Sequence, residues 1–159
     1  MKANNWGRKS KARQVALKYG YKSGLELDVS KQITEANYPL NYETEKLEYI
    51  VPETKHTYTP DFIFTKKNGA KMYVETKGRW TNIDRKKTKN VLASNPGIDL
   101  RFVFQNPNQK ITKNSKTTYA MHALKIGVNE VAKMDIPEAW LKECVKIGEE
   151  PNNPKKFFG

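Results

Sequence analysis

The chain has 159 residues, of which 37% are hydrophobic and 11% aromatic, enough for one modest core, so we expect a single folded domain and exclude wholesale disorder. Its 29 Lys and Arg residues against 17 Asp and Glu give a formal net charge of +12. A lone cysteine, Cys144, excludes an internal disulfide and a zinc site built from several cysteines. No apolar run approaches the roughly 18 residues of a transmembrane helix or the about 7 of a signal-peptide core, so we expect a soluble protein that is not exported by that route.

The excess of positive charge predicts an anionic partner. Nucleic acid is the leading candidate, and an anionic membrane surface comes second because no basic amphipathic stretch supports it. The charge is most one-sided in residues 1–22, which contain no acidic residue. We predict a mobile basic arm here, which either contacts nucleic acid or only aids solubility.

In chain order, the first strong helix signal follows Ser23, because Glu26 stands three positions later as in a capping box. Asn37-Tyr38-Pro39 ends this helix. Strands are predicted over residues 42–51, 58–64, 71–77 and 100–104, with Pro52 directly after the first. Further helices are predicted over residues 82–94, from Thr117 or Thr118 to Gly127, and after Pro137. This order predicts a mixed α/β fold over residues 23–147, with a sheet flanked by helices and a flexible tail at residues 148–159.

The second and third predicted strands form a hairpin around Lys67-Asn68-Gly69. Alternate side chains of a strand share a face, so Glu75 and Lys77 project together. The place of Asp61 depends on the turn. A two-residue loop, which Asn-Gly usually indicates, puts Asp61 on the opposite face, whereas a three-residue loop with a left-handed Gly69 puts it across from Glu75. The chemistry of these residues favours the longer loop, although the local turn signal does not require it.

With the longer loop, the two carboxylates have their Cβ atoms about 5 Å apart, beside the Lys77 ammonium. Two like charges this close are stable only when a cation neutralises them, and carboxylate oxygens suit Mg²⁺ or Mn²⁺. Such ions hold scissile phosphate oxygens and lower the pKa of bound water. Lys77 would orient or deprotonate that water, or stabilise charge that develops on phosphorus. The alternative is a surface Glu-Lys pair and an Asp at a strand start, but the net charge favours an enzyme that cleaves phosphodiesters. Spacing alone explains Glu26 better as a cap than as a third catalytic carboxylate.

Five motifs stand in order along the chain. They are Ser-Gly-Leu-Glu at 23–26, His-Thr-Tyr-Thr-Pro-Asp-Phe at 56–62, Val-Glu-Thr-Lys-Gly at 74–78, Asp-Arg-Lys-Lys at 84–87 and Ile-Pro-x-x-Trp at 136–140. Together they resemble the phage endonuclease I family, the Holliday-junction resolvases of podophages that infect enteric bacteria. The resemblance runs from about Ser23 to Glu143.

The resemblance implies a restriction-endonuclease-like core that cuts four-way and other branched DNA with paired nicks. It implies Mg²⁺ as cofactor, with Mn²⁺ able to substitute and two ions per site. The implied metal ligands are Asp61, Glu75, the Thr76 backbone carbonyl and Glu26, with Lys77 acting on the water. The resemblance therefore favours a catalytic role for Glu26 and reverses the preference for a cap.

The resemblance also implies an intertwined, domain-swapped homodimer. A bridge over about residues 49–55 would exchange a segment, so that Glu26 of the partner subunit completes the site formed by Asp61, Glu75 and Lys77. The implied location is the cytoplasm of the infected bacterial host. One departure concerns Asn41, which stands where the family carries a glutamate before a Tyr-Glu pair. This departure removes one electrostatic contributor or moves its role to Glu43.

Basic residues near these motifs and in the arm are predicted to contact DNA phosphates. For any one of them, the alternative is a solvent-exposed side chain without a DNA contact. They are Arg8, Lys9, Arg13, Lys22, Arg79, Arg85, Lys86, Lys87 and Lys89. Two rival functions remain open. One is a sequence- or mismatch-specific nuclease with the same core, and the other is a non-catalytic basic protein that binds nucleic acid.

Overall fold

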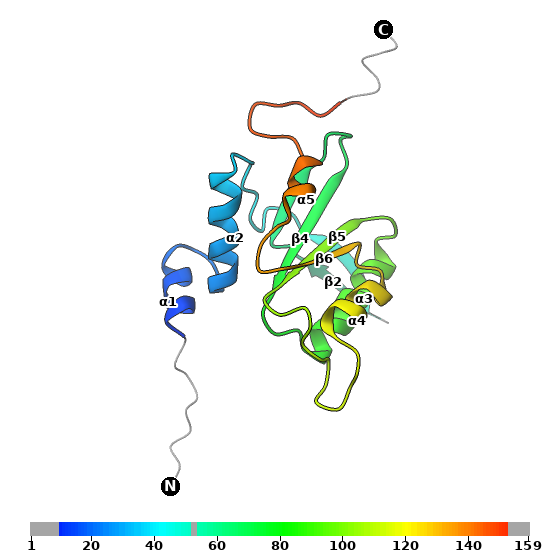
Figure 1. Cartoon of the computed structure of the whole chain (residues 1–159). Helices are drawn as coiled ribbons and strands as arrows, with labels where there is room; N and C mark the ends of the chain where they lie inside the picture. The colour runs from blue at the N-terminus through cyan, green and yellow to red at the C-terminus, as the bar shows by residue number, and fades with distance from the viewer. Residues whose placement is uncertain (1–9, 52–53, 153–159) are drawn as a thin grey trace.

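The structure is a computed structural model that describes residues 10–51 and 54–152 (Figure 1). Its helices are α1 Lys11–Lys18, α2 Gly24–Glu35, α3 Asn82–Ser94, α4 Tyr119–Ile126 and α5 Glu138–Lys142. Its strands are β1 Leu47–Val51, β2 Thr54–Tyr58, β3 Phe62–Thr65, β4 Lys71–Lys77, β5 Asp99–Phe104 and β6 Glu130–Lys133. No helix in the described residues is long and apolar enough to cross a membrane.

The central sheet has four strands in the order β3-β4-β5-β6. β3 and β4 are antiparallel, whereas β5 runs parallel to both β4 and β6. Parallel neighbours need a crossover connection, and α3 and α4 lie in these two connections. β1 and β2 form a separate antiparallel pair. The predicted mixed α/β fold, with a mixed sheet flanked by helices, is confirmed.

Helices cover both faces of the central sheet (Figure 1). On one face, α2 and α5 contribute Ile33 and Trp140 to a buried apolar cluster. On the other face, α3, α4 and the β1–β2 pair enclose a second cluster that contains Trp80, Val91 and Phe102. Trp80 is fully buried at the centre of this cluster. Burial on both faces holds β4, the strand that carries Glu75 and Lys77, in the middle of the molecule.

The loop between β3 and β4 is the longer of the two alternatives. The Lys66 N–H donates to the Ala70 carbonyl at 2.7 Å, so three residues form the loop. Gly69 has φ of +87°, in the left-handed region that a residue without Cβ adopts at little cost. The loop length that the chemistry favoured is therefore confirmed, against the usual preference of an Asn-Gly turn.

This loop sets the register of the hairpin. Phe62 lies opposite Val74, so one position further along both strands Asp61 faces Glu75. Thr76 confirms the alignment, because its N–H donates to Asp61 Oδ2 at 2.8 Å. The hairpin therefore brings the two carboxylates to the same end of the sheet.

The chain over residues 42–51 is not the single strand that the sequence predicts. Tyr42 forms only an isolated bridge with Phe62, and β1 begins at Leu47. Glu43 between them has a positive φ of 50°, which interrupts the extended backbone.

Two further differences concern strands. Residues 58–64 divide between the end of β2 and the start of β3, because Pro60 has no N–H to continue a ladder. The sequence does not predict β6 at all. Its four residues form a partly exposed edge strand without apolar alternation, so the usual strand signal is absent.

Part of the predicted mobile arm is a helix. Ser10 caps α1, and Ala16 on this helix is fully buried. A Cβ on Gly24 would lie 3.0 Å from the Ala12 Cβ, so α1 and the start of α2 are in close contact. The expectation of a mobile arm is corrected for α1, because its small residues pack against α2. Residues 1–9 lie outside the described part of the chain.

The structure describes the predicted bridge and the predicted tail only in part. Val51 of β1 pairs with Thr54 of β2 in the same chain, and residues 52–53 between them are outside the described residues. In the tail, the Asn152 N–H donates to the Lys67 carbonyl at 2.6 Å, so residues up to this point follow the β3–β4 loop. Residues 153–159 are not described.

Candidate active site

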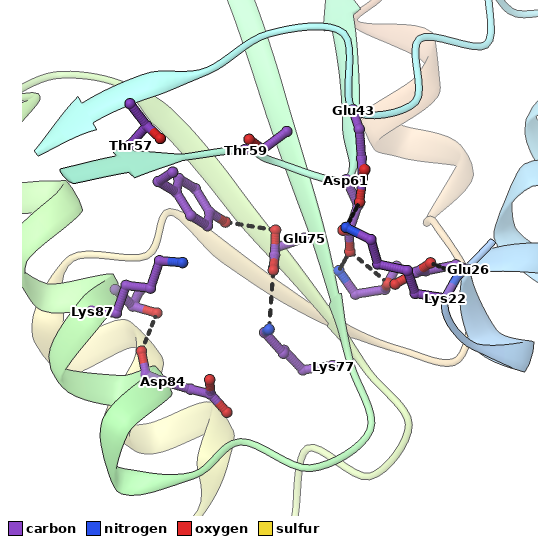
Figure 2. A pocket seen from close by; sticks show the side chains of 13 residues that line it. Lys22, Glu26, Glu43, Thr57, Thr59, Asp61, Glu75, Lys77, Asp84 and Lys87 are labelled. Carbon is purple, nitrogen blue, oxygen red and sulfur yellow. Dashed lines mark hydrogen bonds and ion pairs between the residues drawn. The ribbon is translucent and has the colours of Figure 1, made fainter. Parts of the chain in front are cut away.

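A pocket of about 320 Å³ opens at the end of the sheet where Asp61 and Glu75 meet. We call it the carboxylate pocket. It lies between the start of α2, the β2–β3 connection, the end of β4 and the first turns of α3 (Figure 2). Its charged lining residues are Lys22, Glu26, Glu43, Asp61, Glu75, Lys77, Asp84 and Lys87.

Asp61 is fixed by the neighbouring residue of β4. Its Oδ2 accepts two hydrogen bonds, from the backbone N–H and from the hydroxyl of Thr76, each at 2.8 Å. The Asp61 backbone carbonyl accepts from the Glu43 N–H at 2.9 Å, which ties the residue to the other side of β3. Among the described residues, both hydrogen bonds to the carboxylate end on Oδ2, so Oδ1 is left toward the pocket.

Glu75 is held between a phenol and an ammonium. Tyr58 donates its hydroxyl to Glu75 Oε2 at 2.6 Å, and Lys77 Nζ lies 3.2 Å from Glu75 Oε1 (Figure 2). Tyr58 and Glu75 are both buried, whereas Lys77 is partly exposed at the mouth. The carboxylate therefore has a fixed orientation before any ligand binds.

Burial raises the pKa of both carboxyl groups. Burial is the largest cause that raises the pKa of Asp61 well above its usual value, and the nearby Glu75 charge adds to it. Burial also raises the pKa of Glu75, although Lys77 and Tyr58 act in the opposite direction. Without a further positive charge, ionisation of Asp61 and Glu75 in the pocket is therefore unfavourable.

Asp99, at the other end of the sheet, shows what a structural carboxylate looks like in this protein. It is also largely buried, and burial would raise its pKa. Hydrogen bonds from Arg101, at 2.8 Å, and from Lys66, at 2.9 Å, outweigh burial and lower the pKa of Asp99. Asp61 lacks such a cationic partner among the described residues, so nothing there offsets the effect of burial on its pKa as Arg101 and Lys66 do for Asp99.

Lys77 keeps its charge in this setting. Burial acts to lower the pKa of Lys77, but the nearby carboxylates of Glu75, Asp84 and Asp61 together outweigh it, and the net pKa is raised. The Lys77 side chain is therefore a protonated ammonium at neutral pH. This state suits a group that orients water or stabilises negative charge better than a group that removes a proton.

Glu26 lies in the same pocket and also keeps its capping role. The Ser23 hydroxyl accepts from the Glu26 N–H at 3.1 Å, while Glu26 Oε2 accepts from the Lys22 N–H at 2.8 Å and from the Tyr42 hydroxyl at 2.7 Å. The two interpretations of Glu26 are thus compatible, because capping fixes a carboxylate that lines the pocket. In the single chain described here, Glu26 and Asp61 belong to the same molecule.

Within residues 10–51 and 54–152, no three or more Asp, Glu, His or Cys side chains form a group that could hold an ion. Glu26 therefore does not join Asp61 and Glu75 as a direct third ligand in this arrangement. The Thr76 backbone carbonyl is better placed. The Gln105 N–H donates to the Lys77 carbonyl, so β4 directs residue 77 toward β5 and residue 76 toward the Asp61 side.

Glu43, and not Asn41, lines the carboxylate pocket. Asn41 uses its side-chain amide to donate to the Ile63 carbonyl at 3.1 Å, outside the pocket. Glu43 lines the pocket and pairs with Lys22. Its left-handed backbone conformation, which turns it inward, could not be predicted from alternation along a strand.

The nine predicted phosphate contacts fall in four settings: outside the described residues (Arg8, Lys9), in the carboxylate pocket (Lys22, Lys87), exposed on α1 and α3 (Arg13, Lys86, Lys89), and at a second pocket (Arg79, Arg85).

The sequence analysis does not include Tyr58 and Tyr42, which donate hydrogen bonds to Glu75 and Glu26, among the site residues. The only signal for Tyr58 was its place three residues before Asp61.

A mixed sheet that ends in two buried carboxylates and a lysine, in a protein with a net charge of +12, defines the class of a nuclease. The profile of the family described as phage endonuclease I matches residues 4–155. Endonuclease I of Escherichia phage T7 is 41% identical over 126 residues, which cover 79% of this chain and 81% of that protein. Endodeoxyribonuclease 1 of Enterobacteria phage T3 is 39% identical over 126 residues, covering 79% and 80%. The chain belongs to the phage endonuclease I family, and the resemblance seen in its motifs is confirmed.

The electrostatics of the pocket predict that Asp61→Asn stabilises the protein in EDTA at pH 7 by about 1 kcal/mol. The asparagine oxygen still accepts from Thr76, while the buried charge is removed. The folded-state pKa of Asp61 is raised, so the wild-type penalty is full above that pKa and disappears as the pH falls below about 4, the ordinary carboxyl pKa. Urea unfolding across this pH range measures the difference.

Asp99→Asn is the matched control. The pKa of Asp99 is lowered, so its carboxylate contributes stability above the ordinary carboxyl pKa and loses it as the pH falls through the lowered value. This variant should lose about 3 kcal/mol at pH 7. If Asp61→Asn is destabilising at pH 7 in the same way, then Asp61 is a structural residue and the electrostatic interpretation of the pocket is wrong.

Proposed function

We propose that this protein is a structure-selective endodeoxyribonuclease that cuts four-way and other branched DNA with paired nicks, using Mg²⁺. The observation that carries the proposal is the buried pair Asp61 and Glu75, aligned across the β3–β4 hairpin with no ion-pair partner for Asp61 in the part of the chain that the structure describes. The two named relatives are an endonuclease and an endodeoxyribonuclease, which supports DNA as the substrate.

The residues present suit a hard divalent cation. Asp61, Glu75 and the Thr76 carbonyl supply oxygen ligands from two adjacent strands, and Mg²⁺ usually takes only one or two carboxylates and fills its remaining positions with water and phosphate oxygens. Mn²⁺ accepts similar ligands, so we expect it to substitute. Lys22, Glu26 and Glu43 complete the far wall, where Glu26 would hold water ligands or a second ion.

When bound, the metal would polarise the scissile phosphate and lower the pKa of an attacking water. Lys77 orients that water, or stabilises the negative charge that develops on the phosphate, from its place beside Glu75. Tyr58 keeps the Glu75 carboxylate from rotating away. Lys87, whose Nζ lies 5.6 Å from the centre of the Tyr58 ring, provides a positive wall toward the incoming strand.

The proposal predicts that a fixed four-way DNA junction is nicked near its branch point in Mg²⁺, but not in EDTA, and much faster than a linear duplex of equal length. Glu75→Gln should lower the cleavage rate by roughly 10³-fold, because it removes one metal ligand and one partner of Lys77. Gel analysis of end-labelled junctions measures both effects.

In the same assay, Glu138→Gln serves as control, because Glu138 pairs with Lys142 on the exposed surface of α5. It should cleave like the wild type. Binding of the junction without cleavage in either Mg²⁺ or Mn²⁺ would favour the non-catalytic alternative. Equal cleavage of linear duplex would favour a nuclease without preference for branches.

Paired nicks need two active sites, so we also propose that the protein acts as an intertwined homodimer. In the single chain, β1 and β2 pair across a two-residue connection. If this connection opens, α1, α2 and residues 41–51 of one chain could pack on the sheet of another with the same contacts. Glu26 of the partner subunit would then complete a site built from Asp61, Glu75 and Lys77. Because the relatives are phage proteins, the expected place of action is the cytoplasm of the infected host.

A mixed dimer tests the exchange directly. Chains with Glu26→Gln and chains with Glu75→Gln are each expected to be inactive. When they are co-expressed and purified as a heterodimer, an exchanged dimer contains one site with both glutamates intact and one site with neither, so single-strand nicking returns to about half of the wild-type rate. Without exchange, each site of the heterodimer lacks one glutamate. A heterodimer that remains inactive would therefore contradict the exchanged dimer.

A further inference from the structure

A second pocket lies on the other side of the first turn of α3. Its volume is about 610 Å³, and it is walled by Arg79, the start of α3, Tyr119 and the loop that runs from Asn106 to Lys113. We call it the basic pocket, because its charged lining residues are Arg79, Arg85, Lys110 and Lys113 and none of its lining residues is acidic. Four cations around a concave surface without an acid repel each other unless an anion is present.

Arg85 gives the strongest indication of a ligand. Its residue surface is only 8% exposed, and its Nη1 donates to the Trp80 carbonyl at 2.6 Å. None of the ion pairs in the described part of the chain includes this guanidinium. A buried charge without a counter-ion is costly, and Arg85 has further N–H donors beyond the one in use. The contrast with Arg101 is direct, since Arg101 is equally buried and contacts Asp99, Glu130 and Glu143.

The start of α3 adds donors to the same pocket. Thr81 caps this 13-residue helix, and its side chain accepts from the Asp84 N–H. The N–H groups of Asn82 and Ile83 have no partner within the helix, as is general for a first turn. The positive end of the helix dipole therefore points toward the side where Asn82 and Arg85 line the pocket.

The opposite wall is held in place by its own hydrogen bonds. The Tyr119 N–H donates to the Gln109 carbonyl at 2.7 Å, and the Ile111 N–H donates to the Thr117 carbonyl at 3.0 Å. Lys110 also forms an isolated bridge with Thr118. The loop is thus anchored to the start of α4 (Figure 1), and its backbone hydrogen bonds hold this wall of the basic pocket in place without a ligand.

The two pockets share the first turn of α3. Asp84 and Thr88 line the carboxylate pocket, whereas Asn82 and Arg85 line the basic pocket. Arg79 follows Lys77 by two residues, so their Cα atoms are at most about 7 Å apart. A nucleic acid strand that leaves the carboxylate pocket over this turn would therefore bring a neighbouring phosphate to the basic pocket.

We infer that the basic pocket is a binding site for a backbone phosphate of the DNA strand that is cut in the carboxylate pocket. The identity of the anion rests on the proposed function, because a cleaved strand must continue beyond the metal site. Arg85 and the α3 amides would contact the phosphate, and Lys110 and Lys113 would close the pocket over it. The site needs no metal, so it can be measured without catalysis.

The test compares two double variants of the full-length, metal-free protein in EDTA. Lys110→Gln with Lys113→Gln removes two charges from the basic pocket. Lys142→Gln with Lys146→Gln removes two exposed lysines near α5 at the far end and serves as the matched control. Binding to a labelled four-way junction is measured over a range of salt concentrations.

The pocket variant should bind roughly tenfold more weakly, and the slope of log K against log salt should fall by about 1 to 2, while the control keeps the wild-type slope. Equal changes in both variants, or no change in either, would overturn the assignment, because only general electrostatics would then be at work. Glu75→Gln should keep the full slope although it does not cleave. A wild-type protein that fails to cleave would thus refute the proposed function without altering this comparison.

Inorganic phosphate provides an independent probe of the pocket itself. In NMR titrations of the metal-free protein, the amide signals of Asn82 and Ile83 and the Arg85 Nε–H signal should shift in a saturable way, and the shift should weaken in the pocket variant. The absence of a saturable shift would overturn the pre-formed site. A phosphate response together with unchanged DNA binding in the pocket variant would identify a small-anion site and contradict the DNA assignment.

Discussion

The structure depends on one alignment, in which Asp61 faces Glu75 across the β3–β4 hairpin. This alignment follows from the three-residue loop and the left-handed Gly69, since a loop one residue shorter would move Asp61 to the opposite face of the sheet. Burial of both sheet faces then fixes β4 in the centre, so the register cannot slip without exposing its apolar residues. The proposed active site is therefore a consequence of loop length and core packing together.

The alignment carries an electrostatic cost that the fold only partly offsets. Thr76 supplies two hydrogen bonds to Asp61, and Tyr58 and Lys77 orient Glu75, yet the pKa of both carboxyl groups stays raised because both are buried. By contrast, the partly buried carboxylate of Asp99 contacts two cations, Lys66 and Arg101. Asp61 has no such cationic partner among residues 10–51 and 54–152, and this difference from Asp99 supports the proposal that a metal ion binds at Asp61.

The sequence predicted much of this arrangement, for physical reasons that can be traced. Capping residues located the starts of α2, α3 and α4, and the chemistry of Asp61, Glu75 and Lys77 selected the correct loop against the local Asn-Gly preference. What could not be predicted depends on contacts distant in sequence. Glu43 enters the pocket through a backbone interruption, and α1 forms because its small residues meet α2. Tyr58 reaches Glu75 from β2, which belongs to the separate β1–β2 pair and not to the central sheet.

The central claim is that Asp61 and Glu75 bind a divalent cation, and direct titration with Mn²⁺ followed by electron paramagnetic resonance tests it most directly. Metal-free wild-type protein should bind Mn²⁺ in a saturable way, in competition with Mg²⁺ and with protons, because both carboxyl groups have raised pKa values. Asp61→Asn should lose this binding, whereas Asp99→Asn, once shown to be folded, should keep it. Saturable binding that is equal in the wild type and in Asp61→Asn, or no binding in the wild type, would contradict the account.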